Sequence, residues 1–152
     1  VQGMRPLIGY NYGAGEIKRV KKLFGISVLL NGMIMLVGTI ICFTASETLM
    51  GMFTENPETV RFGTAALQII SIGFIPSAIS VTASGALEGL SKGAQSLVIS
   101  LLRYIIVIIP AAYLLCHFAG ADAVWNAFWI CEFITAVVVG IGIKYYWNRL
   151  LQ

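Results

Sequence analysis

The sequence predicts an all-α protein, an integral membrane helical bundle with four complete transmembrane helices and the end of a fifth. Three observations support this prediction. Of the 152 residues, 58% are hydrophobic and only 11% are charged. Soluble domains carry about 25% charged residues, so this chain has too few polar groups to cover a surface that faces water. Long uncharged stretches also alternate with short segments that hold the basic residues, as membrane spans do.

The first segment, residues 1–13, is expected to be the last part of a membrane helix, and we expect the chain to be a piece of a longer protein. A turn motif closes the segment, because glycine adopts positive φ at little cost. No βαβ pattern surrounds its glycines, so they are not a nucleotide fingerprint and are assigned to chain reversal rather than to binding. The motif consists of Pro6, Gly9, Gly13 and Gly15.

The first complete span is expected over residues 16–46. Within it, residues 23–46 are uncharged and would extend about 36 Å as a helix, enough to cross a ~30 Å bilayer core. An acidic segment, 47–61, follows and contains the breaker Asn56-Pro57. This segment is therefore predicted to be an outer loop.

Three further spans are predicted over residues 60–90, 95–117 and 123–147. Pro76 lies near the middle of the first of these and Pro110 lies within the second. A proline inside a helix removes one backbone hydrogen bond and kinks the helix. The two prolines could serve as hinges for alternating access or form static kinks, and the sequence alone favours neither.

The basic residues predict the orientation of the bundle. Positive charge favours the cytoplasmic side of a membrane. This rule places Lys18–Lys22, Lys92 and the C-terminus in the cytoplasm, with the protein in the plasma (inner) membrane. Arg61 stands alone in the outer loops, whereas the predicted inner segments hold Lys18, Arg19, Lys21, Lys22, Lys92, Lys144 and Arg149.

Two charged residues fall inside predicted spans and are the main candidates for an ion or substrate pathway. Glu132 is expected to meet protons or cations in a cavity, because acids inside a membrane are costly and usually face a cavity or a partner. Its alternative is a protonated carboxyl or one that reaches the outer interface. Arg103 is expected to play a structural role, with its long stem reaching back to water. Glu88 is its expected partner, since both lie toward the inner side.

Two uncharged polar residues, Asn31 and Gln68, could line the same pathway, although hydrogen bonds between helices are the favoured interpretation. No serine–histidine–acid set or metal cluster is visible, so neither a catalytic residue nor a resident cofactor is expected, and the protein is not expected to be an enzyme. The three cysteines lack CxxC spacing, and buried free thiols are expected.

Two motifs resemble the multidrug and toxic compound extrusion (MATE) family. They are PLIGYNYGAG at residues 6–15, followed by a basic run, and GALEGLSKGAQSLVISLLRY at residues 85–104. The resemblance implies two lobes of six helices, with residues 1–152 forming part of the C-terminal lobe from the end of helix eight through helix twelve. It also implies export of organic cations and other amphipathic compounds in exchange for Na⁺ or H⁺.

Three functions are therefore considered. The first is a fragment of a multidrug or organic-cation efflux antiporter that works by alternating access on a Na⁺ or H⁺ gradient. The second is a flippase of lipid-linked sugars in the same superfamily. The third is a truncated membrane fragment that does not transport and needs partner helices. The expected partners are the lipid bilayer, the missing N-terminal helices of a parent protein and small amphipathic or cationic compounds, and no nucleic acid is expected.

Overall fold

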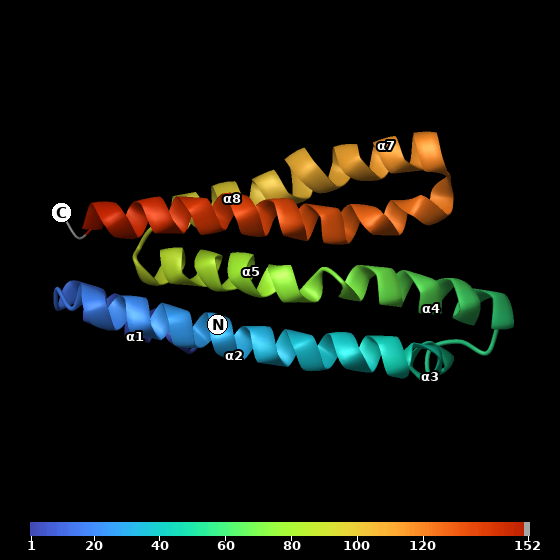
Figure 1. Cartoon of the computed structure of the whole chain (residues 1–152), viewed down its shortest axis with the longest axis horizontal. Helices are drawn as coiled ribbons and strands as arrows, with labels where there is room; N and C mark the ends of the chain where they lie inside the picture. Colours follow the sequence, from blue (N-terminus) through green and yellow to red (C-terminus); the bar gives the residue numbers. More distant parts are fainter. Residues whose placement is uncertain (151–152) are drawn as a thin grey trace.

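The computed structural model describes the backbone of residues 1–150 and the side chains of these residues except Ala121 and 146–150. Within this range the chain is helical and contains no strand, which confirms the predicted all-α class (Figure 1). The elements are α1 (Met4–Gly13), α2 (Ile17–Thr44), α3 (Ser46–Gly51), α4 (Pro57–Ser71), α5 (Phe74–Gly89), α6 (Gly93–Leu101), η1 (Leu102–Ile108), α7 (Ile109–Ala119), η2 (Ala121–Trp125) and α8 (Asn126–Leu150).

The long helices run side by side along one axis of an elongated bundle (Figure 1). Helix α5 occupies the centre, in contact with α1, α2 and α8. Helix α6 contacts α5, whereas η1 and α7 pack against α8, with α7 on the far side of α8 from α2. Helices α1, α2 and α8 therefore take their positions around α5.

Three described helical stretches are long and apolar enough to cross a membrane: Ile17–Thr44, Gly93–Ala119 and Asp122–Tyr145. A fourth span arises only if α4 and α5, which meet at a bend of 56°, are taken together. By length and composition the bundle thus holds three or four spans, and the segment expected to be the second span is a broken helix.

The break between α4 and α5 lies at Ile72 and Gly73, just before Pro76. The amides of Ile72 and Gly73 donate to the carbonyls three residues back, at 3.3 and 2.9 Å, which tightens the end of α4. Pro76 then falls in the first turn of α5, where a missing N–H costs nothing because amides there have no helical partner. The proline therefore begins a new helix instead of kinking a continuous one.

The span from Gly93 to Ala119 is continuous but takes a π-helical form in η1, directly before Pro110. Pro110 lacks an N–H, and in an α-helix its ring would clash with the carbonyl of Ile106. A wider π turn, whose hydrogen bonds skip one further residue, relieves that clash. Arg103 lies within this π-helical segment.

Small residues form the interior of the bundle. The buried face of α5 carries alanine, serine, threonine, glycine and a single leucine. Gly89 lies so close to α1 that an added Cβ would stand 2.8 Å from the carbonyl oxygen of Arg5. Large side chains such as Leu29 and Ile34 point outward instead. This arrangement allows close helix contact and presents the apolar bulk to the surroundings, as in membrane bundles.

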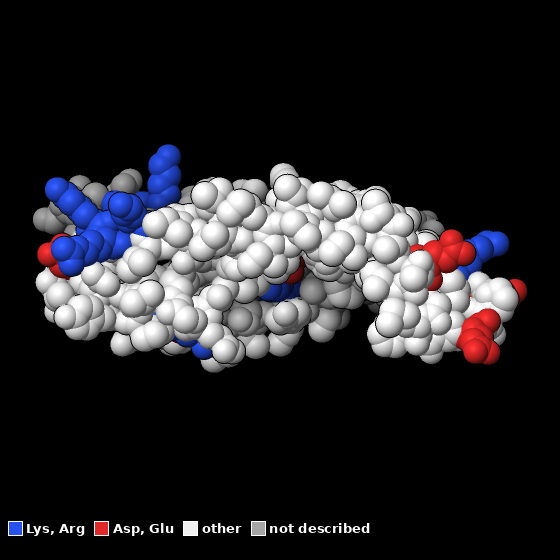
Figure 2. All heavy atoms as spheres, turned by 90° about the horizontal axis from the view of Figure 1, so that it is seen from below, with Lys and Arg blue, Asp and Glu red and all other residues white. Residues whose placement is uncertain are grey.

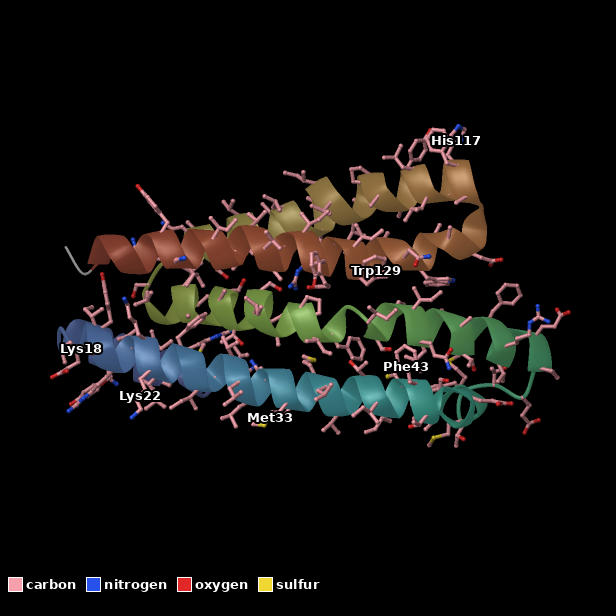
Figure 3. All side chains as sticks on the ribbon, viewed as in Figure 1. Lys18, Lys22, Met33, Phe43, His117 and Trp129 are labelled. Atoms are coloured by element: carbon pink, nitrogen blue, oxygen red, sulfur yellow. The ribbon has the colours of Figure 1, made fainter. Side chains whose placement is uncertain are left out.

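Most of the charge lies at the two ends of the bundle on the face shown in Figure 2, apart from small charged spots between them. Lys and Arg gather at the end where α2 begins, called here the lysine end, which carries Lys18, Lys21 and Lys22. Acidic residues gather at the opposite end, near α3 and α4. Figure 3 labels Lys18 and Lys22 at one end of α2 and Phe43 at the other. The side chain of Arg149 lies outside the described residues.

Candidate functional site

One pair of opposite charges meets inside the bundle. Arg103 of η1 and Glu132 of α8 form a salt bridge with Nη2 and Oε2 2.8 Å apart. Their side chains are only 11% and 19% exposed. Nη2 of Arg103 also donates to the hydroxyl of Ser80 on α5, and this hydroxyl lies 3.4 Å from Oε2 of Glu132. Arg103, Glu132 and Ser80, the charge cluster, thus join three helices.

This pairing corrects the expected one, because the prediction of Glu88 as the partner of Arg103 is wrong. Glu88 instead accepts from Arg5 at 2.8 Å and from the hydroxyl of Ser96 at 2.9 Å. Arg103 does not reach back to the inner surface either, since its guanidinium contacts Glu132.

The physical reason for the correction is depth in the bundle. Arg103 lies ten residues into the span that begins at Gly93, and Glu132 lies ten residues into the span that begins at Asp122 from the opposite end. At 1.5 Å per residue both are about 15 Å deep, near the middle of a ~30 Å bilayer core. Two residues predicted at different depths are therefore level with each other.

The backbone around the charge cluster is irregular on two sides. Arg103 belongs to the π-helical segment, and its carbonyl accepts a hydrogen bond from the thiol of Cys131 at 3.2 Å. Gly73, at the break between α4 and α5, lies so close that an added Cβ would stand 3.3 Å from Cγ of Glu132. Two broken or distorted helices therefore meet at one buried carboxylate, an arrangement typical of ion and substrate sites in transporters.

The salt bridge is held at a single point. Both hydrogen bonds of the guanidinium use Nη2, whereas the buried Nε has no hydrogen-bond partner among the described residues. Oε1 of Glu132 likewise makes no hydrogen bond within the described part of the chain. The strongest arginine–carboxylate pairs use two nitrogens and two oxygens. The contact between Arg103 and Glu132 is therefore weaker than a two-point pair, and it leaves Nε of Arg103 and Oε1 of Glu132 available for other partners.

The other predicted pathway residues lie apart from the charge cluster. The amide of Asn31 donates to the hydroxyl of Thr82 at 2.7 Å, which links α2 to α5. The amide of Gln68 donates to the hydroxyl of Ser46 at 3.0 Å, which links α4 to α3. Each amide therefore bridges two helices, and a role for either in substrate contact stays a prediction.

The predicted hinge and turn residues occupy distinct places. Pro76 follows the break before α5, four residues before Ser80, and Pro110 follows the π-helical segment that contains Arg103. In the turn motif, Pro6 lies inside α1, Gly9 packs on Gly89, and Gly13 ends α1. Gly15 alone among the four has a left-handed backbone, with φ of +74°.

The sequence interpretation missed three residues near Glu132: Ser80, Gly73 and Cys131. Gly73 had a signal, because a glycine three residues before a proline marks a break. Ser80 had only a weak one, as a small hydroxyl residue in an uncharged span. Among the described residues, no three His, Cys, Asp or Glu side chains lie together in a group that could hold a metal ion.

Comparison with known proteins adds to this geometry. The MatE family model matches residues 1–114. The multidrug export protein MepA of Staphylococcus aureus (strain bovine RF122 / ET3-1) is 26% identical over 151 residues, which cover 98% of this chain and 33% of MepA. The probable multidrug resistance protein NorM of Pseudomonas syringae pv. tomato (strain ATCC BAA-871 / DC3000) is 28% identical over 153 residues, which cover 95% of this chain and 33% of NorM.

A solved structure shows the same fold. A MOP superfamily transporter from Pyrococcus furiosus matches with a TM-score of 0.92 at 16% identity, covering 98% of this chain and 34% of the transporter. The chain thus spans about a third of the length of the relatives that it matches.

Proposed function

This chain belongs to the MatE family, and from that premise we propose that it forms the last third of a multidrug or organic-cation exporter. The similarity to MepA and NorM over 33% of their length supports a place within a longer transporter, and the motifs at residues 6–15 and 85–104 are the reason for proposing its C-terminal part. Transport, rather than catalysis, is the proposed activity. The lipid bilayer and the remaining helices of the parent protein are its proposed partners.

The charge cluster is the observation that carries the proposal. An ionisable pair inside a membrane is costly and marks an ion or substrate pathway in transporters. Glu132 lies beside the break before α5 and Arg103 lies within the π-helical segment, which supports alternating access through bending at these two places. A Na⁺ or H⁺ gradient is the proposed energy source, and small amphipathic or cationic compounds are the proposed cargo.

The proposed orientation puts the lysine end in the cytoplasm of the cell, in the plasma (inner) membrane, because basic residues favour that side. The chain alone is not proposed to transport, since part of one lobe cannot enclose a cavity between two lobes. No observation favours the flippase alternative. The buried Arg103 and the half-exposed Arg5 are each paired with a glutamate, so neither offers a free cationic group for a lining in the described part of the chain.

Efflux of a fluorescent organic cation from cells tests the proposal. Cells that express the full parent protein are expected to accumulate less ethidium than cells with an empty vector, and collapse of both the proton and the sodium gradients is expected to abolish the difference. Glu132→Gln is expected to reduce export strongly, whereas Glu55→Gln in the loop before α4 serves as the matched control. Export that persists without either gradient would overturn the proposal.

A further inference from the structure

We infer that Glu132 and Ser80 form a site for a small monovalent cation, and that Arg103 fills this site as a tethered counter-ion. The inference deepens the proposed function by naming what the buried carboxylate binds. It rests on the proposed function in one respect, because it assumes that a cation from solution reaches the site.

The oxygen atoms around the guanidinium have the character of a cation site. Oε2 of Glu132 and the hydroxyl of Ser80 both contact Nη2 of Arg103. The carbonyl of Ser77 lies 3.2 Å from the same hydroxyl. Carboxylate, hydroxyl and carbonyl oxygens beside a broken helix are the groups that hold coupling cations in transporters. Here a positively charged nitrogen of the chain itself takes that place.

The guanidinium excludes a second cation while it stays in place. Nη2 lies 2.8 Å from Oε2, so another cation on that oxygen would stand within a few ångströms of a full positive charge. Repulsion between like charges is strong in an interior of low dielectric constant. No other charged side chain contacts Glu132 in the described part of the chain, since Arg5 and Glu88 engage each other. Arg103 alone therefore decides whether the site is open.

The contact can also be exchanged. The guanidinium is held through one nitrogen, its Nε is unpartnered within the described residues, and Oε1 of Glu132 is free of hydrogen bonds there. Both side chains retain some exposure, 11% and 19%, in this part of the bundle. The guanidinium also lies 5.9 Å from the ring centroid of Tyr104, its neighbour in the sequence. A long side chain held by so few contacts can swing away without a change in the backbone.

Sodium binding to the purified full parent protein tests this inference. Sodium chloride is exchanged for choline chloride at constant ionic strength, and the melting temperature is followed as sodium rises. Arg103→Gln is expected to respond to sodium with an apparent affinity at least about tenfold tighter than that of the unaltered protein. Arg103→Lys keeps the charge and is expected to respond like the unaltered protein. Arg103→Gln combined with Glu132→Gln is expected to lose the gained response.

A second measurement adds free guanidinium to a variant that lacks the guanidinium group of Arg103. Guanidinium at millimolar concentration is expected to raise the melting temperature of Arg103→Ala, compared with choline, but not that of Arg103→Ala combined with Glu132→Gln. Absence of both the sodium and the guanidinium response would overturn the inference, as would responses that persist without Glu132. Neither measurement requires transport. A failure of drug export would therefore reject the proposed function without deciding whether the cation binds at Glu132.

Discussion

At the scale of single residues, the attraction between Arg103 and Glu132 offsets part of the cost of burying each charge in an apolar interior. Two buried charges lose their hydration, and their mutual attraction compensates for this loss only in part. An apolar pair of equal volume can therefore be as stable, whereas one charge without its partner is strongly destabilising. The pair, with side chains 11% and 19% exposed, falls in this buried class.

Glu132→Gln is accordingly expected to lower the free energy of unfolding by about 3 kcal/mol, because it leaves the charge of Arg103 buried without a counter-charge. The double variant with Arg103→Gln is expected to lose less than the sum of the two single losses. Denaturant unfolding in detergent measures all three. Glu55→Gln, on an exposed loop, is the control and should stay within about 0.5 kcal/mol. Additive losses would contradict the coupling.

Gly89→Ala is expected to destabilise the bundle by about 1–3 kcal/mol, because a methyl group forced into a tight contact shifts the backbone. Its Cβ would meet the carbonyl oxygen of Arg5 at 2.8 Å, and backbone atoms cannot rotate away. Gly142→Ala on α8 is the matched control, since nothing lies within 4 Å of the added carbon. Thermal unfolding of the two variants should separate them, and equal melting temperatures would disprove the close contact between α1 and α5.

At the scale of elements, prolines act by setting where helices begin and how they wind. The sequence predicts a distortion near Pro76 and another near Pro110, and both regions are distorted. The form of each distortion was not predictable. Whether a chain kinks, breaks or widens depends on what packs against it, and the backbone of Gly73 packs against Trp129 and Glu132 of α8. These neighbours lie more than fifty residues away in sequence.

Pro110→Ala is expected to convert η1 toward an ordinary α-helix, because the clash that favours the wider turn disappears. Amide hydrogen exchange of residues 103–108, followed by mass spectrometry, is expected to slow by about tenfold as their hydrogen bonds strengthen. Pro57→Ala, at the start of α4, removes a proline without touching η1 and serves as the control. Unchanged exchange in residues 103–108 would show that the π-helical form has another cause.

At the scale of the whole molecule, the fold class was predictable because the low charge content and the long uncharged stretches together predict apolar helices. The charge pattern along the chain likewise anticipates basic and acidic ends (Figure 2). The charge cluster was not predictable, because pairing depends on how far each helix slides past the next. If the helix that carries Arg103 were shifted along its axis by a few residues, Arg103 would lie at a different depth from Glu132. Nothing in the local sequence specifies the size of that shift.

The orientation of the two ends gives a prediction for the whole molecule. In intact cells that express the parent protein with Cys116→Ser, a membrane-impermeant thiol reagent is expected to label Phe53→Cys, which replaces an exposed side chain in the loop between α3 and α4. Ala14→Cys, in the turn at the lysine end, should react only after permeabilisation. Labelling of Ala14→Cys in intact cells, with Phe53→Cys protected, would reverse the proposed orientation.

The small side chains of α5 also constrain how this protein can change over generations. Its buried positions cannot accept larger side chains, since Ser77, Ala83 and Ala86 are already buried in a helix that packs against α1, α2 and α8. The outward faces of α2 and η1 tolerate exchange among Leu, Ile, Val and Phe, because hydrocarbon of any shape accommodates them. In a saturation mutagenesis library, the buried positions of α5 are therefore expected to accept only small residues. The outward positions of α2 and η1 are expected to accept many apolar residues.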